Sequence, residues 1–265
     1  MSARESIIPV FVPHLGCPND CVFCNQRRIS GSLVPARPED VAEAIERAAG
    51  VTPEGTRRQL AFYGGSFTAI PDAEQEALLG AAQPYLERGV ISSIRLSTRP
   101  DAIDGAVLAR LRRFGVETVE LGAQSMSERV LALSGRGHTA EDVRRGAHML
   151  KDAGFTVILQ AMAGLPGDCG TWRRTAEELA ALSPDGARIY PVAVVRDTAL
   201  YDMWRRGTYR PLTVPEGADA AADMLEVFLE HGIPVIRIGL NPTEELSGGA
   251  VVAGAYHPAL GEMAR

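Results

Sequence analysis

Cys17-Pro-Asn-Asp-Cys21-Val-Phe-Cys24 is the stretch around which this chain is organised, and it holds three of the four cysteines of the protein. Thiols separated by three and then two residues can ligate three metal ions of one cluster, which leaves one metal ion without a protein ligand. Structural zinc usually has four protein ligands, and an electron-transfer [4Fe-4S] cluster usually has four cysteines. A three-cysteine loop therefore favours a cluster that binds a further ligand at its open iron.

A second interpretation of the loop is a zinc site that is completed by His14 or by a distant ligand. The fourth cysteine does not decide between the two. Cys169 follows a Gly-Asp pair, and we expect it to begin a helix and not to ligate the metal.

Composition and charge place the chain among soluble globular proteins. It has 265 residues, of which 46% are hydrophobic and 23% are charged, and its formal net charge of -6 argues against a large phosphate-binding surface. The first residues contain no apolar signal segment, and no later stretch reaches eighteen consecutive apolar residues. Clustered cysteines without a disulfide framework are typical of a reducing compartment. The sequence thus predicts a cytoplasmic protein with no membrane partner.

Apolar runs alternate with amphipathic helical patterns along the chain, which is typical of a parallel α/β sheet with right-handed crossovers. A seventh strand, Pro234 to Ile238, is expected at an edge. We expect one domain over residues 1–240 and a tail or cap over 241–265, with a flexible stretch at 248–254, unless the natural chain continues past Arg265. The six main strands are predicted at Ile7–Val12, Arg58–Tyr63, Ile91–Leu96, Val116–Leu121, Phe155–Met162 and Ala187–Val195.

The C-x3-C-x2-C spacing, with Phe23 directly before the third cysteine, resembles the radical S-adenosylmethionine (SAM) superfamily. The resemblance implies a partial (β/α)6 TIM-like barrel whose [4Fe-4S] cluster binds SAM and cleaves it to a 5′-deoxyadenosyl radical. It also implies that Phe23 packs near the adenine. Gly64-Gly65 lies where the family has a motif that binds the amino group of SAM, although Ser66 replaces its usual glutamate; a simple tight turn is the alternative.

Further motifs, in the same order along the chain, resemble the radical SAM half of elongator protein 3-like proteins, which is similar to the oxygen-independent coproporphyrinogen oxidases. Elongator protein 3 modifies the wobble uridine of tRNA and has an additional acetyltransferase domain. The motifs are His14-Leu-Gly-Cys17, Phe62-Tyr-Gly-Gly-Ser-Phe-Thr68, Ser97-Thr-Arg-Pro-Asp101, Glu120-Leu-Gly-Ala-Gln-Ser125, Ser134-Gly-Arg-Gly-His-Thr139, Gly164-Leu-Pro-Gly-Asp168 and Arg188-Ile-Tyr-Pro191.

This resemblance supplies the remaining SAM contacts. It implies that Gln124 and Arg136 hold SAM, and a guanidinium suits the carboxylate because it is always charged and forked. Gln160 stands where relatives have an aspartate that faces SAM, and Met162 where they have an apolar residue on the adenine. Ser97 replaces a glutamate that accepts from the ribose, so this contact is expected to be weaker. Without the family, Arg136 would be a surface cation and Met162 a core residue.

The resulting prediction is a radical SAM enzyme whose radical abstracts hydrogen from an unidentified substrate, for which tRNA is a candidate. The alternative is an RNA-binding or scaffold module that keeps the cluster without turnover. The resemblance implies a flavodoxin- or ferredoxin-type reductant, and no catalytic residue is assigned. Substrate contacts are expected among polar residues at strand ends, namely Tyr63, Arg99, Asp101, His138, Arg188 and Tyr190.

Overall fold

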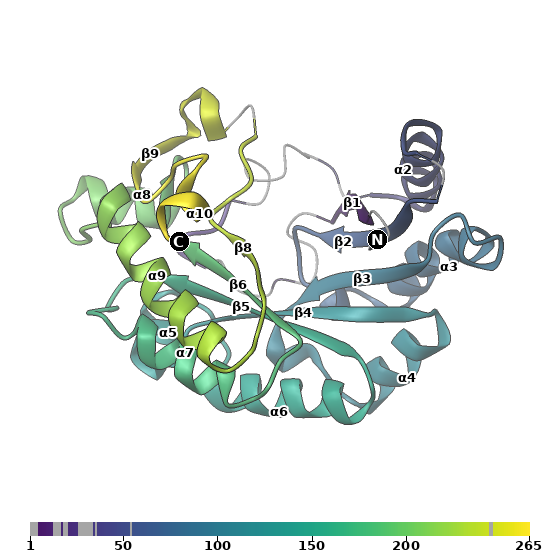
Figure 1. Cartoon of the computed structure of the whole chain (residues 1–265), viewed down its shortest axis with the longest axis horizontal. Coiled ribbons are helices and arrows are strands. Elements are labelled where there is room, and N and C mark those ends of the chain that lie inside the picture. Colours follow the sequence, from purple (N-terminus) through teal and green to yellow (C-terminus); the bar gives the residue numbers. More distant parts are fainter. Residues whose placement is uncertain are drawn as a thin grey trace.

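A computed structural model describes residues 5–12, 17, 21–25, 34, 36–53, 55–243 and 246–265. Its main sheet has seven parallel strands in the order β1-β2-β3-β4-β5-β6-β8, curled into a partial barrel with helices on its outer side (Figure 1). The predicted parallel α/β barrel is confirmed, and the seventh strand lies at the expected edge. The strands are β1 Glu5–Phe11, β2 Arg57–Tyr63, β3 Ser93–Thr98, β4 Val116–Gln124, β5 Thr156–Ala163, β6 Gly186–Pro191 and β8 Val235–Ile238.

Helices follow the strands where the sequence supplies start signals. Thr139 and Thr213 each form a capping box with the acidic residue three positions later, Asp142 or Glu216, and so satisfy free amides at the first turn. No helix of the described ranges is long and apolar enough to cross a membrane. The α-helices are α2 Pro38–Val51, α3 Asp72–Glu87, α4 Gly105–Arg113, α5 Glu128–Leu133, α6 Ala140–Asp152, α7 Trp172–Ala180, α8 Ala199–Arg205, α9 Val214–Glu230 and α10 Leu260–Met263.

The two faces of the sheet differ in chemistry because successive side chains of a strand point to opposite sides. One set, including Phe62, Leu96, Leu121 and Leu159, is fully buried in the core with apolar residues of the outer helices. The other set is largely polar and lines the concave side. The barrel thus has an apolar outer layer and a polar interior.

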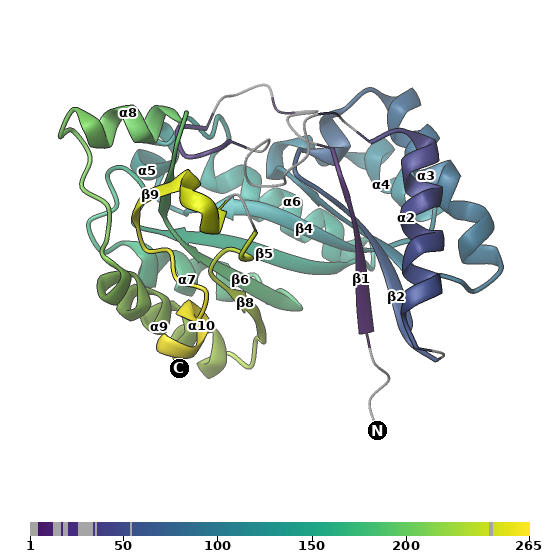
Figure 2. The ribbon, with the colours of Figure 1, turned by 90° about the horizontal axis from the view of Figure 1, so that it is seen from above.

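The predicted single strand from Ala187 to Val195 is wrong in its second half. The chain leaves the main sheet after Pro191, and β7 Ala193–Val195 pairs antiparallel with β9 Val251–Gly254. Gly254 permits this pairing, since a Cβ there would lie 2.5 Å from the carbonyl oxygen of Val192. The stretch expected to be flexible, 248–254, therefore includes the end of η3 Leu246–Ala250 and all of the paired strand β9, which lie with α8 beside one end of the sheet (Figure 2). The division at residue 240 stays a prediction.

Candidate functional site

A cavity of about 960 Å³ occupies the concave side of the sheet. Its wall includes all three residues of the cysteine loop that were predicted to bind metal, and all eight residues predicted to contact SAM. The sequence alone therefore identified side chains that the fold brings to one place. These are Cys17, Cys21, Cys24, Phe23, Gly64, Gly65, Ser97, Gln124, Arg136, Gln160 and Met162.

The cysteine loop stands against two arginines. Arg136 Nη1 donates to Cys21 Sγ at 3.2 Å, and Arg99 Nη2 donates to the Arg136 carbonyl at 3.0 Å. Desolvation raises the pKa of the Cys17 thiol, and the neighbouring Cys21 adds to this, whereas Arg136 and Arg99 lower it. At least two thiols thus share one electrostatic environment with two cations.

The thiols are not arranged as a finished metal site. Among the described residues, no three Cys, His, Asp or Glu side chains are grouped so that they could hold one metal ion. Their ligation of a cluster therefore stays a prediction.

Arg136 joins the cysteine loop to the end of β4. Its Nη2 donates to the carbonyl of Gly122 at 2.6 Å, and a Cβ at Gly122 would lie 3.3 Å from Nη2 and 2.9 Å from Gln124 Nε2. Only glycine leaves room for both side chains at this point. The predicted pair of SAM contacts is consequently packed side by side at the carboxyl end of one strand.

Gln124 has a strained backbone. Its φ is +65°, a left-handed conformation that costs a residue with a side chain about 1–3 kcal/mol, and the β4–β5 register shifts between Gly122 and Gln124. The side chain is buried, and its Oε1 has no hydrogen-bond partner within the described structure. An unpaired acceptor on a cavity wall is available to a ligand.

The apolar part of the wall lies beside the cysteine loop. Phe23 and Met162 pack against a buried cluster that contains Val130, Leu165 and Val192. Met162 is thus both a core residue and a cavity residue, so its two interpretations are compatible.

Gly64 adopts a φ of +95°, which favours glycine after β2.

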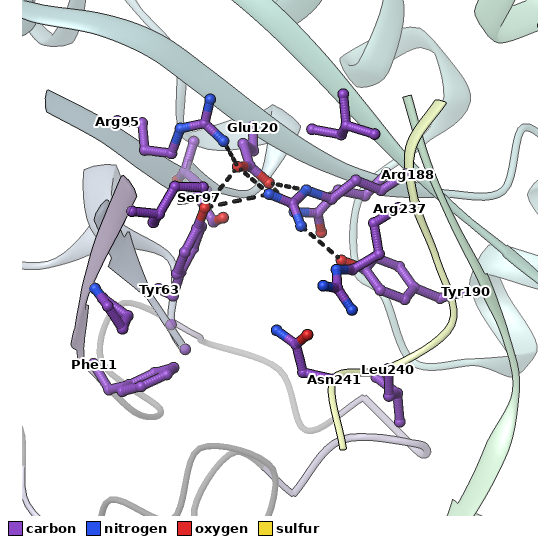
Figure 3. Close-up of a pocket in the computed structure, with 18 of the residues that line it drawn as sticks. Phe11, Tyr63, Arg95, Ser97, Glu120, Arg188, Tyr190, Arg237, Leu240 and Asn241 are labelled. Carbon is purple, nitrogen blue, oxygen red and sulfur yellow. Dashed lines mark hydrogen bonds and ion pairs between the residues drawn. The ribbon is translucent and has the colours of Figure 1, made fainter. Parts of the chain in front are cut away.

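A buried charge network, which the sequence analysis missed, lies in the same cavity (Figure 3). Glu120 is fully buried, and its Oε1 accepts from Arg95 at 3.1 Å, Arg188 at 2.9 Å and the Tyr63 hydroxyl at 3.0 Å. Its Oε2 accepts from Gln160 at 2.9 Å and lies 2.8 Å from Arg188 Nε, in an ion pair without hydrogen-bond alignment. The Glu120 carboxylate on β4 therefore binds side chains from four other strands, β2, β3, β5 and β6.

The network also fixes the protonation of its tyrosines. Burial, with Glu120 adding to it, raises the pKa of Tyr63 to about 12, and burial raises the pKa of Tyr190 as well. The pKa of Arg188 is raised by Glu120 and by both tyrosines, against the effect of burial. At neutral pH the tyrosines are hydroxyl donors and Arg188 is a cation.

Ser97 and Gln160 acquire neighbours that the sequence did not show. In the β3–β4 register Ser97 is paired with Glu120, and the Ser97 Oγ is buried without a hydrogen-bond partner among the described residues. The carboxylate that the family resemblance implied at position 97 is absent from β3, and the adjacent strand β4 carries one in Glu120. Gln160, expected to face SAM, donates to that same carboxylate.

Three expectations for polar residues are wrong in position. Asp101 and His138 do not line the cavity. His138 is 4% exposed, and its Nε2 lies 3.2 Å from the Ala123 carbonyl; burial, with Arg136 adding to it, lowers its pKa to about 4, so it is a neutral packing residue. Cys169 is exposed and precedes α7, which begins at Trp172 and not at the cysteine.

Comparison with known proteins gives the class to which this fold and site belong. Residues 11–180 match the radical SAM superfamily and residues 184–265 match the radical SAM C-terminal domain. The chain therefore belongs to the radical SAM superfamily. The predicted class, a radical SAM enzyme, is confirmed at this level.

Its relatives are elongator protein 3-like, as the motifs indicated. Human Elongator complex protein 3 is 32% identical over 189 residues, which are 63% of this chain and 34% of that protein. The tRNA uridine(34) acetyltransferase of Methanocaldococcus jannaschii is 34% identical over 128 residues, 47% of this chain and 24% of the relative. An uncharacterized protein of the same archaeon is 29% identical over 248 residues, 87% of this chain and 73% of the relative. The chain thus spans about a third or less of the two named relatives.

Solved structures confirm the fold. An Elp3 of Methanocaldococcus infernus superposes with a TM-score of 0.75 at 22% identity. The match covers 100% of this chain and 62% of the Elp3 chain. The coproporphyrinogen III oxidase of Escherichia coli, a radical SAM enzyme, superposes with a TM-score of 0.61 at 19% identity. The match covers 87% of this chain and 54% of the oxidase chain.

The residues present fit the [4Fe-4S] cluster and SAM that the family implies. Three cysteines line the cavity, whereas Cys169 lies outside it, so the donor set has the three thiols that such a cluster uses. Ser97 Oγ and Gln124 Oε1 are buried polar atoms that lack a partner in the described part of the chain, on residues of the same wall. Both observations suit a polar ligand beside a three-cysteine cluster.

Proposed function

We propose that this chain binds a [4Fe-4S] cluster and SAM in the cavity and initiates a radical reaction on a substrate held in the same space. When bound, and with one electron from an external flavodoxin- or ferredoxin-type reductant, these two cofactors would supply a cleavage of SAM to methionine and a hydrogen-abstracting radical. The observation that carries the proposal is the convergence of the three loop cysteines and eight predicted SAM contacts on one cavity wall. A volume of about 960 Å³ is at the upper end for small-molecule sites and leaves space for a second molecule.

Each part of the wall has a distinct task in this proposal. Cys17, Cys21 and Cys24 hold the cluster, and Arg136 binds the SAM carboxylate next to it. Gln124 Oε1 and the Gly64 backbone supply polar contacts to SAM. The barrel around them excludes water and orients the reactants, which is the contribution a protein makes to cofactor chemistry.

The decisive experiment is a search for product from SAM. The protein is reconstituted anaerobically with iron and sulfide, then incubated with SAM and dithionite, and 5′-deoxyadenosine is quantified by chromatography. We expect more than one 5′-deoxyadenosine per chain. A loaded protein that binds SAM but forms none would favour the alternative, an RNA-binding or scaffold module that keeps its cluster without turnover.

Arg136 gives a test of the SAM site alone. Because hydrogen bonds to charged groups contribute about 1.5–3 kcal/mol, Arg136→Ala is expected to weaken SAM binding by that amount while the iron content stays unchanged. Equilibrium binding of SAM to the loaded protein measures this. Arg145→Ala is the control, since Arg145 lies on α6 and pairs with Asp142 at the surface. Equal SAM affinity in the two variants would return Arg136 to a structural role.

The name of one relative, a tRNA uridine(34) acetyltransferase, makes tRNA the substrate to examine first, although it describes a longer protein. Phosphate-dominated binding falls steeply as salt rises. Acidic residues outnumber basic ones by 33 to 27, so we expect this chain alone to bind tRNA weakly. A salt titration of tRNA binding by fluorescence anisotropy measures it. Tight binding with a steep salt dependence would show that this domain is itself a tRNA-binding surface.

A further inference from the structure

The cavity has a charge opposite to that of the chain. Six arginines and three glutamates line it among the described residues, an excess of three positive charges, whereas the whole chain has a formal charge of -6. Arg99 and Arg136 stand by the cysteines, and Arg57 pairs with Glu117 at 3.2 Å. The other three arginines of the cavity, Arg95, Arg188 and Arg237, make an excess of positive charge around Glu120.

The unbalanced charge concentrates on two neighbouring strands. Arg188 of β6 and Arg237 of β8 are partners in the parallel register, and both line the cavity. Adjacent strands are about 4.8 Å apart, and like charges placed directly opposite each other are destabilising. Arg188 is paired with Glu120, but Arg237 has no carboxylate partner in the described structure. Arg188 is buried and Arg237 is half-buried. An anion between or beside these two cations would offset their repulsion and desolvation.

Tyr190 adds a directed donor. Arg188 Nη1 donates to its hydroxyl oxygen at 3.4 Å, so the hydroxyl proton of Tyr190 is not used in that contact. Within the described residues this proton has no acceptor. Arg237 and Asn241 lie on the same side of the cavity as Tyr190 (Figure 3). Two guanidinium groups and one hydroxyl thus offer N–H and O–H donors, which suits a carboxylate or a phosphate.

We propose that Arg188, Arg237 and Tyr190 form a subsite for an anionic group of the substrate, a carboxylate or a phosphate. The inference rests on the proposed function, because it assigns the part of the cavity that SAM is not predicted to use. The predicted SAM contacts lie on the cysteine loop, after β2, on β3, β4 and β5, and at Arg136. The subsite belongs to β6 and β8, so substrate and SAM would enter the cavity from different strands.

Anion binding can be measured without radical chemistry. The full chain is titrated with inorganic phosphate and, separately, with acetate at constant ionic strength made up with chloride, and the midpoint of thermal unfolding, Tm, is followed to obtain Kd. We expect at least one of the two anions to raise Tm, and the stronger one identifies the source as a phosphate ester or a carboxylic acid. Arg237→Gln is expected to raise that Kd at least tenfold, and Tyr190→Phe several-fold. Arg57→Gln, a control from the same cavity with its own carboxylate partner, is expected to keep it.

Three results would overturn the subsite. The first is a wild-type Tm that neither anion raises above chloride, and the second is a Tm response that Arg237→Gln retains. The third is a loss of SAM affinity in Arg237→Gln as large as in Arg136→Ala, which would assign these cations to SAM itself. Failure of 5′-deoxyadenosine formation with intact anion binding would instead reject the proposed function and leave the subsite in place.

Discussion

Replacing Cys17, Cys21 or Cys24 with alanine is expected to abolish the [4Fe-4S] cluster, because a three-thiol donor set has no spare protein ligand. Cys169→Ser is the matched control, since this cysteine is exposed and lies outside the cavity. Iron and acid-labile sulfide per chain, measured after anaerobic reconstitution, are expected to fall to background in the three loop variants. They are expected to stay at the wild-type level in Cys169→Ser, and SAM binding should follow the iron.

Two outcomes would contradict this assignment. Iron loss in Cys169→Ser equal to that in the loop variants would make Cys169 a ligand after a rearrangement of the chain. A tightly held zinc ion with no sulfide would instead support the second interpretation of the loop, a zinc site with a fourth ligand elsewhere.

The strands could be predicted from local signals, and so could the meeting of several strand ends and loops at one cavity. Apolar runs identify strands that are buried beneath helices, and loops after parallel strands meet at one edge of a barrel. For this reason Gly64 could be placed beside the cysteine loop without coordinates, whereas Gln124 and Met162 were placed in the site only by the family resemblance. The roles of these residues toward SAM stay predictions from that resemblance.

The Glu120 network could not be predicted in the same way. Tyr63 and Arg188 were expected in the site, but Arg95 and Glu120 lie inside strands and were not expected to contact them. A signal was present, since every second residue from Arg95 to Ser97 and from Thr118 to Gly122 lines the cavity while the residues between them are apolar. The contacts themselves depend on strand register, which period-two alternation does not specify.

Long-range contacts and local backbone strain could not be predicted from the sequence either. Arg136 and Cys21 are 115 residues apart, and only the folded barrel brings the guanidinium to the thiol. The positive φ of Gln124 arises at the β4–β5 register shift, and glutamine gives no sequence signal for that conformation. The expected position of His138 was wrong: Arg136 of the same motif lines the cavity, whereas the His138 ring lies at the carbonyl of Ala123.

Glu120→Gln is expected to lower the free energy of unfolding by about 3–5 kcal/mol, because it leaves the buried Arg188 and the largely buried Arg95 without their carboxylate. Arg95 and Arg188 have side chains that are 13% and 11% exposed, and that of Glu120 is 0% exposed. Glu117→Gln is the matched control on the same strand. Its pair with Arg57 has side chains that are 44% and 47% exposed, so its loss is expected to cost no more than about 1 kcal/mol. Urea denaturation of the two variants measures the difference.

The cause of that loss can be separated from a general defect in packing. If uncompensated positive charge is responsible, removing one of the two cations should recover part of the stability. The double variant Glu120→Gln/Arg95→Gln is therefore expected to be more stable than Glu120→Gln alone, which is a coupling that a double-mutant cycle detects. An additive cycle, or a Glu120→Gln variant as stable as Glu117→Gln, would mean that water in the cavity already screens these charges. In that case the excess of positive charge would cost the fold little and would no longer require an anion.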